Sequence, residues 1–333
     1  MFKMKQQLTS NVPGIGIATI TGLAALFLSE HYTAPAMLFA LLLGIALSFL
    51  YEDAKCKAGI EFTASTVLRI GVALLGFRIS FTDLSTLGFP TVTLLVVGIV
   101  STILFGLVLS RMLGLSRELG ALSGGSVGIC GASAAMAISA VLPNSPEKER
   151  DTLLTIICVT SLSTIAMVLY PIIADRLELS AFETSIFLGG TIHDVAQVVG
   201  AGYSISEETG DMSALVKLVR VSFLMPVVFM FLYVIKLKCK TDNLGQKAPG
   251  FPLFLIAFVV FMTMNSVLSL PVVVQEAAGQ VSQFALIISI TAIGMKSNLG
   301  QLTSVGIKPI VLMVCETVWI AFVILCGLPL IAS

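Results

Sequence analysis

The sequence predicts an all-α polytopic membrane protein with about 10–11 transmembrane helices. Of its 333 residues, 56% are hydrophobic and only 11% are charged, and the mean hydropathy is +1.01. Soluble domains carry about 25% charged residues, so the composition excludes a soluble protein. Apolar runs of about 20 residues alternate with short polar connections. These connections are too short for a soluble domain, so residues 1–333 are predicted to form one transmembrane domain.

Eleven apolar runs can be counted along the chain. They are Val12–Ser29, Ala34–Tyr51, Phe62–Ile79, Pro90–Leu113, Leu119–Leu142, Leu153–Ala174, Phe182–Tyr203, Leu215–Ile235, Phe251–Leu270, Val281–Met295 and Ile307–Ile331. The first run follows two lysines, as a signal peptide would, but no cleavage site of small residues follows Ser29. We therefore interpret it as a retained first span.

The distribution of Lys and Arg predicts the orientation. If the N-terminus is cytoplasmic, thirteen of the nineteen Lys and Arg residues lie in cytoplasmic connections and four in the opposite ones. This positive-inside bias predicts a cytoplasmic N-terminus and a periplasmic or extracellular C-terminus. The formal net charge of zero argues against a nucleic-acid partner. The apolar composition makes membrane lipid the expected surrounding. A homodimer is possible, and the sequence leaves the choice between monomer and homodimer open. Six cysteines without CxxC spacing predict no disulfide framework, metal site or cofactor.

The run from Leu119 to Leu142 has a glycine-rich centre. Four glycines fall within eight residues of it, although each costs roughly 1 kcal/mol relative to alanine inside a helix. Irregular backbone within a membrane persists where it is buried in protein or lines a wet cavity. Transporters hold anions on the N–H groups that begin such half-helices. Close helix packing is the alternative explanation. The expected donors to a substrate are Ser126, Gly128, Cys130, Gly131 and Ser133.

An internal repeat appears when residues 68–88 are aligned with residues 286–306. Five of the 21 positions are identical, and the two copies lie in the third and tenth runs, which would cross the membrane in opposite directions. Weak inverted repeats of this kind are typical of secondary transporters.

Ionisable side chains within the apolar runs are expected to face a cavity or a partner, because a charge in hydrocarbon costs several kcal/mol. The expected substrate-binding side chains are Arg69, Lys217, Arg220 and Gln197, and the expected proton-coupling pair is His193 and Asp194. Structural alternatives are a pairing of Arg69 with Glu316 or Asp194, and a reach of Lys217 to water. Glu316 itself is interpreted as structural.

The expected site has more cations than acids. Arginine and lysine side chains, with broken helix starts, favour an oxyanion, whereas a cation site would need several carboxylates. Gly124–Gly128 also matches the G-x-S-x-G pattern of serine hydrolases. That pattern requires a strand before the serine, and the flanking sequence is helical in character, so a hydrolase is the weakest alternative and no enzyme activity is expected.

Five stretches resemble the YeiH family of bacterial inner-membrane proteins, which carry an inferred label as sulfate exporters. They are LRIGVALLGFRIS at 68–80, GGSVGICGASAAMA at 124–137, GGTIHDVAQVVGAG at 189–202, VKLVRVSFLMP at 216–226 and IGMKSNL at 293–299. The family is similar to the wider bile-acid, arsenite and riboflavin transporter group. One departure is Asp194, where the family more often has glutamate, so the charge is kept.

The resemblance implies two inverted five-helix repeats, a core with crossing broken helices and a panel domain. It implies that Leu119–Leu142 is one crossing helix and Val281–Leu299 its mate, with the span at residues 12–29 as an addition. The combined prediction is a secondary active transporter of the bacterial inner membrane. It would move a small anion such as sulfate or a sulfonate by alternating access, with proton coupling. A cation/proton antiporter that uses Asp194 is the alternative within transport.

Overall fold

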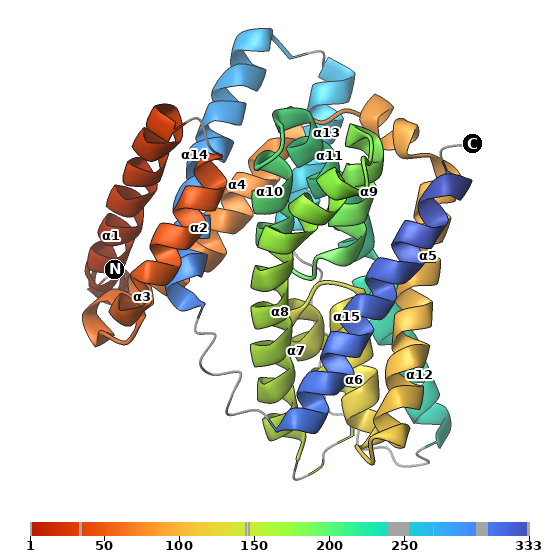
Figure 1. Ribbon diagram of the computed structural model, residues 1–333. Helices are drawn as coiled ribbons and strands as arrows, with labels where there is room; N and C mark the ends of the chain where they lie inside the picture. Colours follow the sequence, from red (N-terminus) through yellow and green to blue (C-terminus); the bar gives the residue numbers. More distant parts are fainter. Residues whose placement is uncertain are drawn as a thin grey trace.

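The computed structural model describes residues 2–32, 35–143, 145, 147–238, 253–268, 270–297 and 306–331. Every regular element in these residues is a helix, and seven of the helices are long and apolar enough to cross a membrane (Figure 1). Over the residues described, each predicted apolar run coincides with a helix or with consecutive helical segments. The prediction of an all-α polytopic membrane protein is therefore confirmed.

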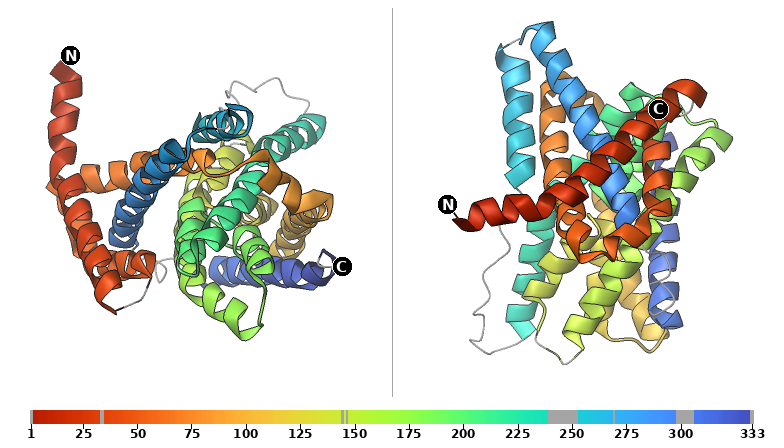
Figure 2. Two further views of the ribbon diagram at one scale, coloured as in Figure 1. Left: turned by 90° about the horizontal axis from the view of Figure 1, so that it is seen from above. Right: turned by 90° about the vertical axis from the view of Figure 1, so that its left-hand side faces the viewer.

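The helices pack as two groups, which we call the panel and the core (Figures 1 and 2). The panel contains α1 (Phe2–Tyr32), α2 (Ala36–Ala46), η1 (Ser48–Tyr51), α3 (Ala54–Phe62), η2 (Thr63–Val67), α4 (Leu68–Leu74), η3 (Leu75–Phe77), α13 (Leu253–Leu268) and α14 (Val272–Lys296). The core contains α5 (Phe81–Met112), α6 (Arg117–Gly128), α7 (Ala132–Val141), α8 (Lys148–Arg176), α9 (Ala181–Thr191), α10 (Val195–Tyr203), α11 (Glu207–Ser222), α12 (Leu224–Lys238), α15 (Ile307–Gly327) and η5 (Leu328–Leu330). The groups meet mainly where α10 packs against α14 and α2.

Glycines bring the panel helices into backbone contact. A Cβ added to Gly14 or to Gly59 would overlap the backbone of the other helix where α1 crosses α3. The same holds for Gly44 and Gly294 where α2 crosses α14. Small residues allow this close approach, which drives helix association in lipid. The first helix is therefore packed into the panel.

The core is walled by α5 and α15. Helix α5 exposes a row of large apolar side chains at Val97, Val100, Leu104 and Val108, with the spacing of one helical face, as a lipid-facing helix requires. On its inner side Gly106 packs against α6. The indole of Trp319 on α15 stacks on Phe105 of α5, with ring centroids 4.7 Å apart.

Two spans of the core are broken in the middle. The first is interrupted between α6 and α7, and the second between α9 and α10. The expected break within Leu119–Leu142 is therefore confirmed. The expectation that Val281–Leu299 is its mate is wrong for the described part of that range, because α14 is one continuous helix from Val272 to Lys296; residues 298 and 299 lie outside the described residues. The second broken span of the described chain is Ala181–Tyr203.

The repeat segments at residues 68–88 and 286–306 fall on α4 to the start of α5 and on the end of α14 to Gly306, with residues 298–305 outside the described residues. Helices α4 and α14 pack against one another within the panel. The repeat stays a prediction.

Candidate functional site

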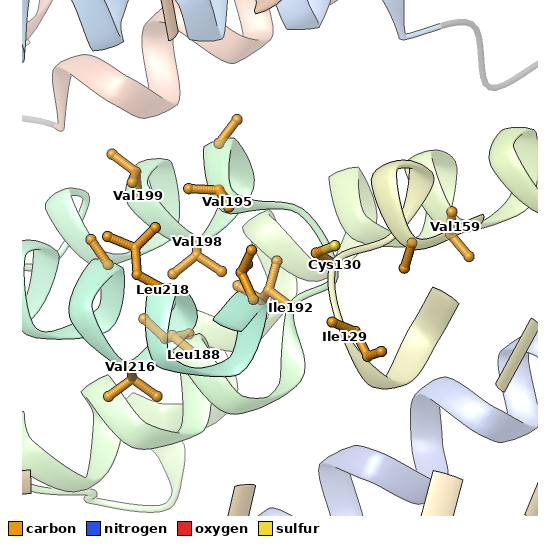
Figure 3. Packing of buried hydrophobic residues seen from close by; sticks show 14 of the residues in the cluster. Ile129, Cys130, Val159, Leu188, Ile192, Val195, Val198, Val199, Val216 and Leu218 are labelled. Carbon is orange, nitrogen blue, oxygen red and sulfur yellow. The ribbon is translucent and has the colours of Figure 1, made fainter. Parts of the chain in front are cut away.

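The two breaks lie beside each other at the centre of the core. Figure 3 shows Ile129 and Cys130 on the chain between α6 and α7, with Ile192 of the second break close by. A Cβ on Gly131 would lie 3.5 Å from the Cβ of His193. Gly131 has φ 63° and ψ −125°, a conformation open to glycine and strained for other residues. The first break therefore requires this glycine.

Two buried cations occupy the carbonyl ends at the breaks. Lys217 and Arg220 on α11 are both 0% exposed. The Lys217 ammonium donates to Ile129 O at 2.7 Å, in the first break, and to Ile192 O at 2.8 Å, in the second. One side chain thus joins the carbonyl ends of α6 and α9.

Arg220 caps the same ends from the next turn of α11. Its Nε donates to Gly128 O at 2.6 Å, its Nη1 donates to Ile192 O at 3.2 Å, and its Nη2 donates to Val127 O. A helix C-terminus leaves carbonyls without intrahelical donors and carries partial negative charge. Both cations therefore donate their hydrogen bonds to backbone carbonyls, and these bonds explain how two charged side chains are tolerated inside the core.

His193 lies in the second break and is fully buried. Its Nδ1 lies 3.1 Å from Thr191 O, and because a carbonyl only accepts, Nδ1 carries a proton. Its Nε2 lies 2.9 Å from the hydroxyl of Thr317 on α15. The ring is thus held between the second break and the core wall.

The helices that follow the two breaks, α7 and α10, begin at a cavity of about 370 Å³ between the core and the panel. Ala132 begins α7, and Asp194 is the N-cap of α10, with its carboxylate accepting from Ala196 N at 3.4 Å. Gln197 is 3% exposed, and its Oε1 has no hydrogen-bond partner among the described residues. From the panel, Lys57 and Lys296 line the same cavity.

The charges around the cavity favour an anion. Its lining contains two lysines and one carboxylate. The starts of α7 and α10 add roughly half a positive charge each through their helix dipoles. Helix N-termini bind anions through free N–H groups, so the lining has a surplus of positive potential that a bound anion would balance.

The structure brings some of the predicted site residues to this place and leaves others away from it. Asp194 and Gln197 line the cavity, and Gly131 caps the helix that begins at its wall. Ser133 and Arg69 are exposed, and neither is among the cavity-lining residues of the described chain. For these two residues a substrate-binding role stays a prediction.

Three further predicted residues lie at the first break but inside the protein. The Ser126 hydroxyl donates to Leu122 O at 2.5 Å within α6. Gly128 uses its carbonyl on Arg220, and Cys130 is buried at 5% exposure. Their direct contact with a substrate also stays a prediction.

The arrangement required by a serine hydrolase is absent from the described residues. Gly124–Gly128 lies wholly inside α6, with no strand before the serine. The Ser126 hydroxyl and the His193 ring bond to different partners, Leu122 O on one side and Thr191 O and Thr317 on the other.

Lys57, Lys296 and the second break were not predicted from the sequence as parts of this site. The lysines stand near the ends of apolar runs, where they serve equally well as positive-inside markers. One signal could have identified the second break: Gly189-Gly190-Thr191 precedes it, as Gly124-Gly125-Ser126 precedes the first.

Comparisons with known proteins agree over most of the chain. A family model described as conserved hypothetical protein 698 matches residues 13–313. UPF0324 membrane protein TauZ of Paracoccus pantotrophus is 52% identical over 321 residues, which cover 96% of this chain and 95% of that protein. A UPF0324 membrane protein of Chlorobaculum tepidum is 48% identical over 314 residues, covering 94% of this chain and 88% of that protein.

Among solved structures, a sodium proton antiporter of Methanocaldococcus jannaschii matches 97% of this chain and 99% of its own, at 12% identity. The TM-score is 0.30, too low to support a common fold or function.

Proposed function

Because the chain belongs to the UPF0324 family of membrane proteins, the family of conserved hypothetical protein 698, we propose that it is a secondary transporter of a small anion. This family matches the YeiH resemblance of the sequence motifs. The observation that carries the proposal is the cavity at the starts of α7 and α10, with Lys57 and Lys296 opposite a single carboxylate.

The two-group architecture supports transport by alternating access. The cavity lies between the panel and the core, so a displacement of one group against the other would change the side from which it is reached. Lys217 and Arg220 hold both breaks to α11, which keeps the two N–H ends in a fixed relation during such a displacement. Substrates of the proposed class include sulfate and small sulfonates.

The same cavity weighs against a cation/proton antiporter. A cation site is normally built from several carboxylate and carbonyl oxygens, and the cavity offers the carboxylate of Asp194 beside two lysines. The carbonyls of the breaks are already paired with Lys217 and Arg220.

The test is anion exchange in proteoliposomes with the Ala132→Asp variant. Ala132 is the first residue of α7 and lines the cavity. An aspartate there is favourable for the helix by about 0.3–1 kcal/mol, but its carboxylate would occupy the place of the anion. We expect exchange of sulfate or a sulfonate by the native protein, and loss of exchange in Ala132→Asp with an unchanged or higher melting temperature.

Ala132→Asn is the matched control, because it has the same size without the charge. It is expected to retain more exchange than Ala132→Asp. Equal activity of the two variants would contradict an anion site at this helix start. A native protein that exchanges none of sulfate, sulfite, sulfonates and dicarboxylates would contradict the function.

A further inference from the structure

Asp194 and Lys296 face the same cavity from opposite groups of helices. Asp194 begins α10 of the core, and Lys296 ends α14 of the panel. Both line the cavity. The ion pairs of the described residues do not include them, so the two side chains share one cavity without a direct ion pair.

The other polar groups around Asp194 are already hydrogen-bonded elsewhere or are buried in the first break. Lys217 approaches from α11, and its ammonium is bonded to two carbonyls. Cys130 is buried in the first break, and the His193 ring turns to Thr191 and Thr317.

Across the cavity, Lys57 lies over the ring of Tyr51, 5.3 Å from its centroid. The Tyr51 hydroxyl donates to Glu61 at 2.7 Å, and Glu61 stands one turn after Lys57 on α3. At this i, i+4 spacing Glu61 neighbours Lys57 on the surface of α3, and we assign the Glu61 carboxylate to balance the charge of Lys57. Lys296 is then the lysine of the cavity whose charge can be balanced either by Asp194 or by a bound anion.

We propose that Asp194 and Lys296 form an exchange pair. When a monovalent anion binds, it replaces the Asp194 carboxylate as the negative charge that balances Lys296, and Asp194 takes up one proton. This inference rests on the proposed function and specifies its substrate class and its coupling. In the empty carrier, Asp194 and Lys296 neutralise each other. In the loaded carrier, the anion neutralises Lys296, and the protonated Asp194 is neutral.

Charge balance explains why the two events would be coupled. When the cavity closes, water leaves and an unbalanced charge becomes costly. The empty pair and the state with both anion and proton are balanced, whereas an anion without a proton leaves one negative charge in excess. Only the balanced states close readily, so transport carries one proton with each anion.

The same balance selects the charge of the substrate. A monoanion such as a sulfonate matches Lys296, whereas the sulfate dianion leaves one negative charge in excess even after Asp194 is protonated. We therefore expect a sulfonate to be preferred over sulfate.

The experiment measures proton uptake when methanesulfonate or sulfate is added to the purified full-length protein in weakly buffered solution with a pH indicator. At about pH 7, the native protein should take up about one proton per methanesulfonate bound. Its affinity should fall as the pH rises, because the protonated form of Asp194 binds the anion. Sulfate should bind more weakly.

Three variants isolate the pair. Asp194→Asn keeps an N-capping side chain and should bind methanesulfonate without proton uptake and without dependence on pH. Lys296→Gln should bind it at least about tenfold more weakly, a change of about 1.4 kcal/mol. Lys308→Gln removes an exposed cation at the start of α15 and should behave as the native protein.

Proton uptake that persists in Asp194→Asn, unchanged affinity in Lys296→Gln, or tighter binding of sulfate would each overturn the exchange pair while leaving an anion transporter in place. Failure of the folded native protein to bind either anion would instead contradict the proposed function, and the exchange pair with it. If Asp194→Asn does not fold, Asp194→Ser, which also caps a helix, takes its place.

Discussion

At the scale of single residues, the site depends on which groups the buried cations Lys217 and Arg220 bond to. Sequence alone identifies Lys217 and Arg220 as cations in an apolar span, and this pattern suits both an anion site and a structural role. The structure pairs them with the carbonyls of Val127, Gly128, Ile129 and Ile192. Only the three-dimensional path of the broken helices brings these carbonyls to α11, and for that reason the pairing could not be predicted from the spacing of the cations.

Lys217→Met is expected to destabilise the protein by about 1–3 kcal/mol, the cost of one buried group left unsatisfied. Ile129 O would lose its hydrogen bond from Lys217, whereas Ile192 O would keep its hydrogen bond from Arg220. The measurement is the melting temperature in detergent, with the exposed Lys308→Met as the control. A variant that melts like the native protein but no longer binds anions would favour direct substrate binding by Lys217.

At the scale of helices, composition and the length of apolar runs predicted the elements well, because lipid requires long, internally hydrogen-bonded apolar helices. The first break was also predictable, since four glycines disfavour a continuous helix. The second break was missed because His193 and Asp194 suggested chemistry more strongly than Gly189-Gly190 suggested an interruption. The misplaced mate followed from the family resemblance, which implied a broken helix where α14 is continuous as far as Lys296.

The contact between α1 and α3 gives a prediction at this scale. Gly59→Ala would drive a methyl group into the Asn11 carbonyl and Gly14, and overpacking of this kind costs about 1–3 kcal/mol. Gly16→Ala is the matched control, because no atom lies within 4 Å of its added Cβ, and it should gain up to about 1 kcal/mol of helix stability. Thermal unfolding of both variants checks the difference, and equal melting temperatures would contradict close packing of α1 on α3.

At the scale of the whole molecule, an ion-pair cluster joins the panel to the core at the end of α14 remote from the Lys296 cavity. Arg78, which follows η3, lies 2.9 Å from Glu207 and 3.1 Å from Asp211 of α11. Arg78 and Glu207 also line a second cavity of about 320 Å³ with the first half of α14, including Gly279. Gly279 and Lys296 are 17 residues apart, about 25 Å along a helix. Alternating access would require this cluster to open when the other end closes.

Arg78→Gln is expected to loosen that end of the molecule. The cluster is partly exposed, so its loss is worth about 0.5–1 kcal/mol and should raise the open population about two- to fivefold. Hydrogen exchange at residues 272–283 and 207–211 should become faster in the variant. Arg150→Gln is the control, because Arg150 pairs with Asp151 inside α8 and joins no two groups. Unchanged exchange in Arg78→Gln would show that the cluster does not hold the panel to the core.

The stacking of Trp319 on Phe105 has a practical consequence for all of these experiments. Trp319 is the single tryptophan of the chain, and it stands in the core wall between α15 and α5. Tryptophan fluorescence, excited at a wavelength that tyrosine does not absorb, therefore reports on the core alone, without any added label. Comparing its melting curve with that of circular dichroism, which follows all the helices, would reveal whether the panel and the core unfold as one cooperative unit or in two steps.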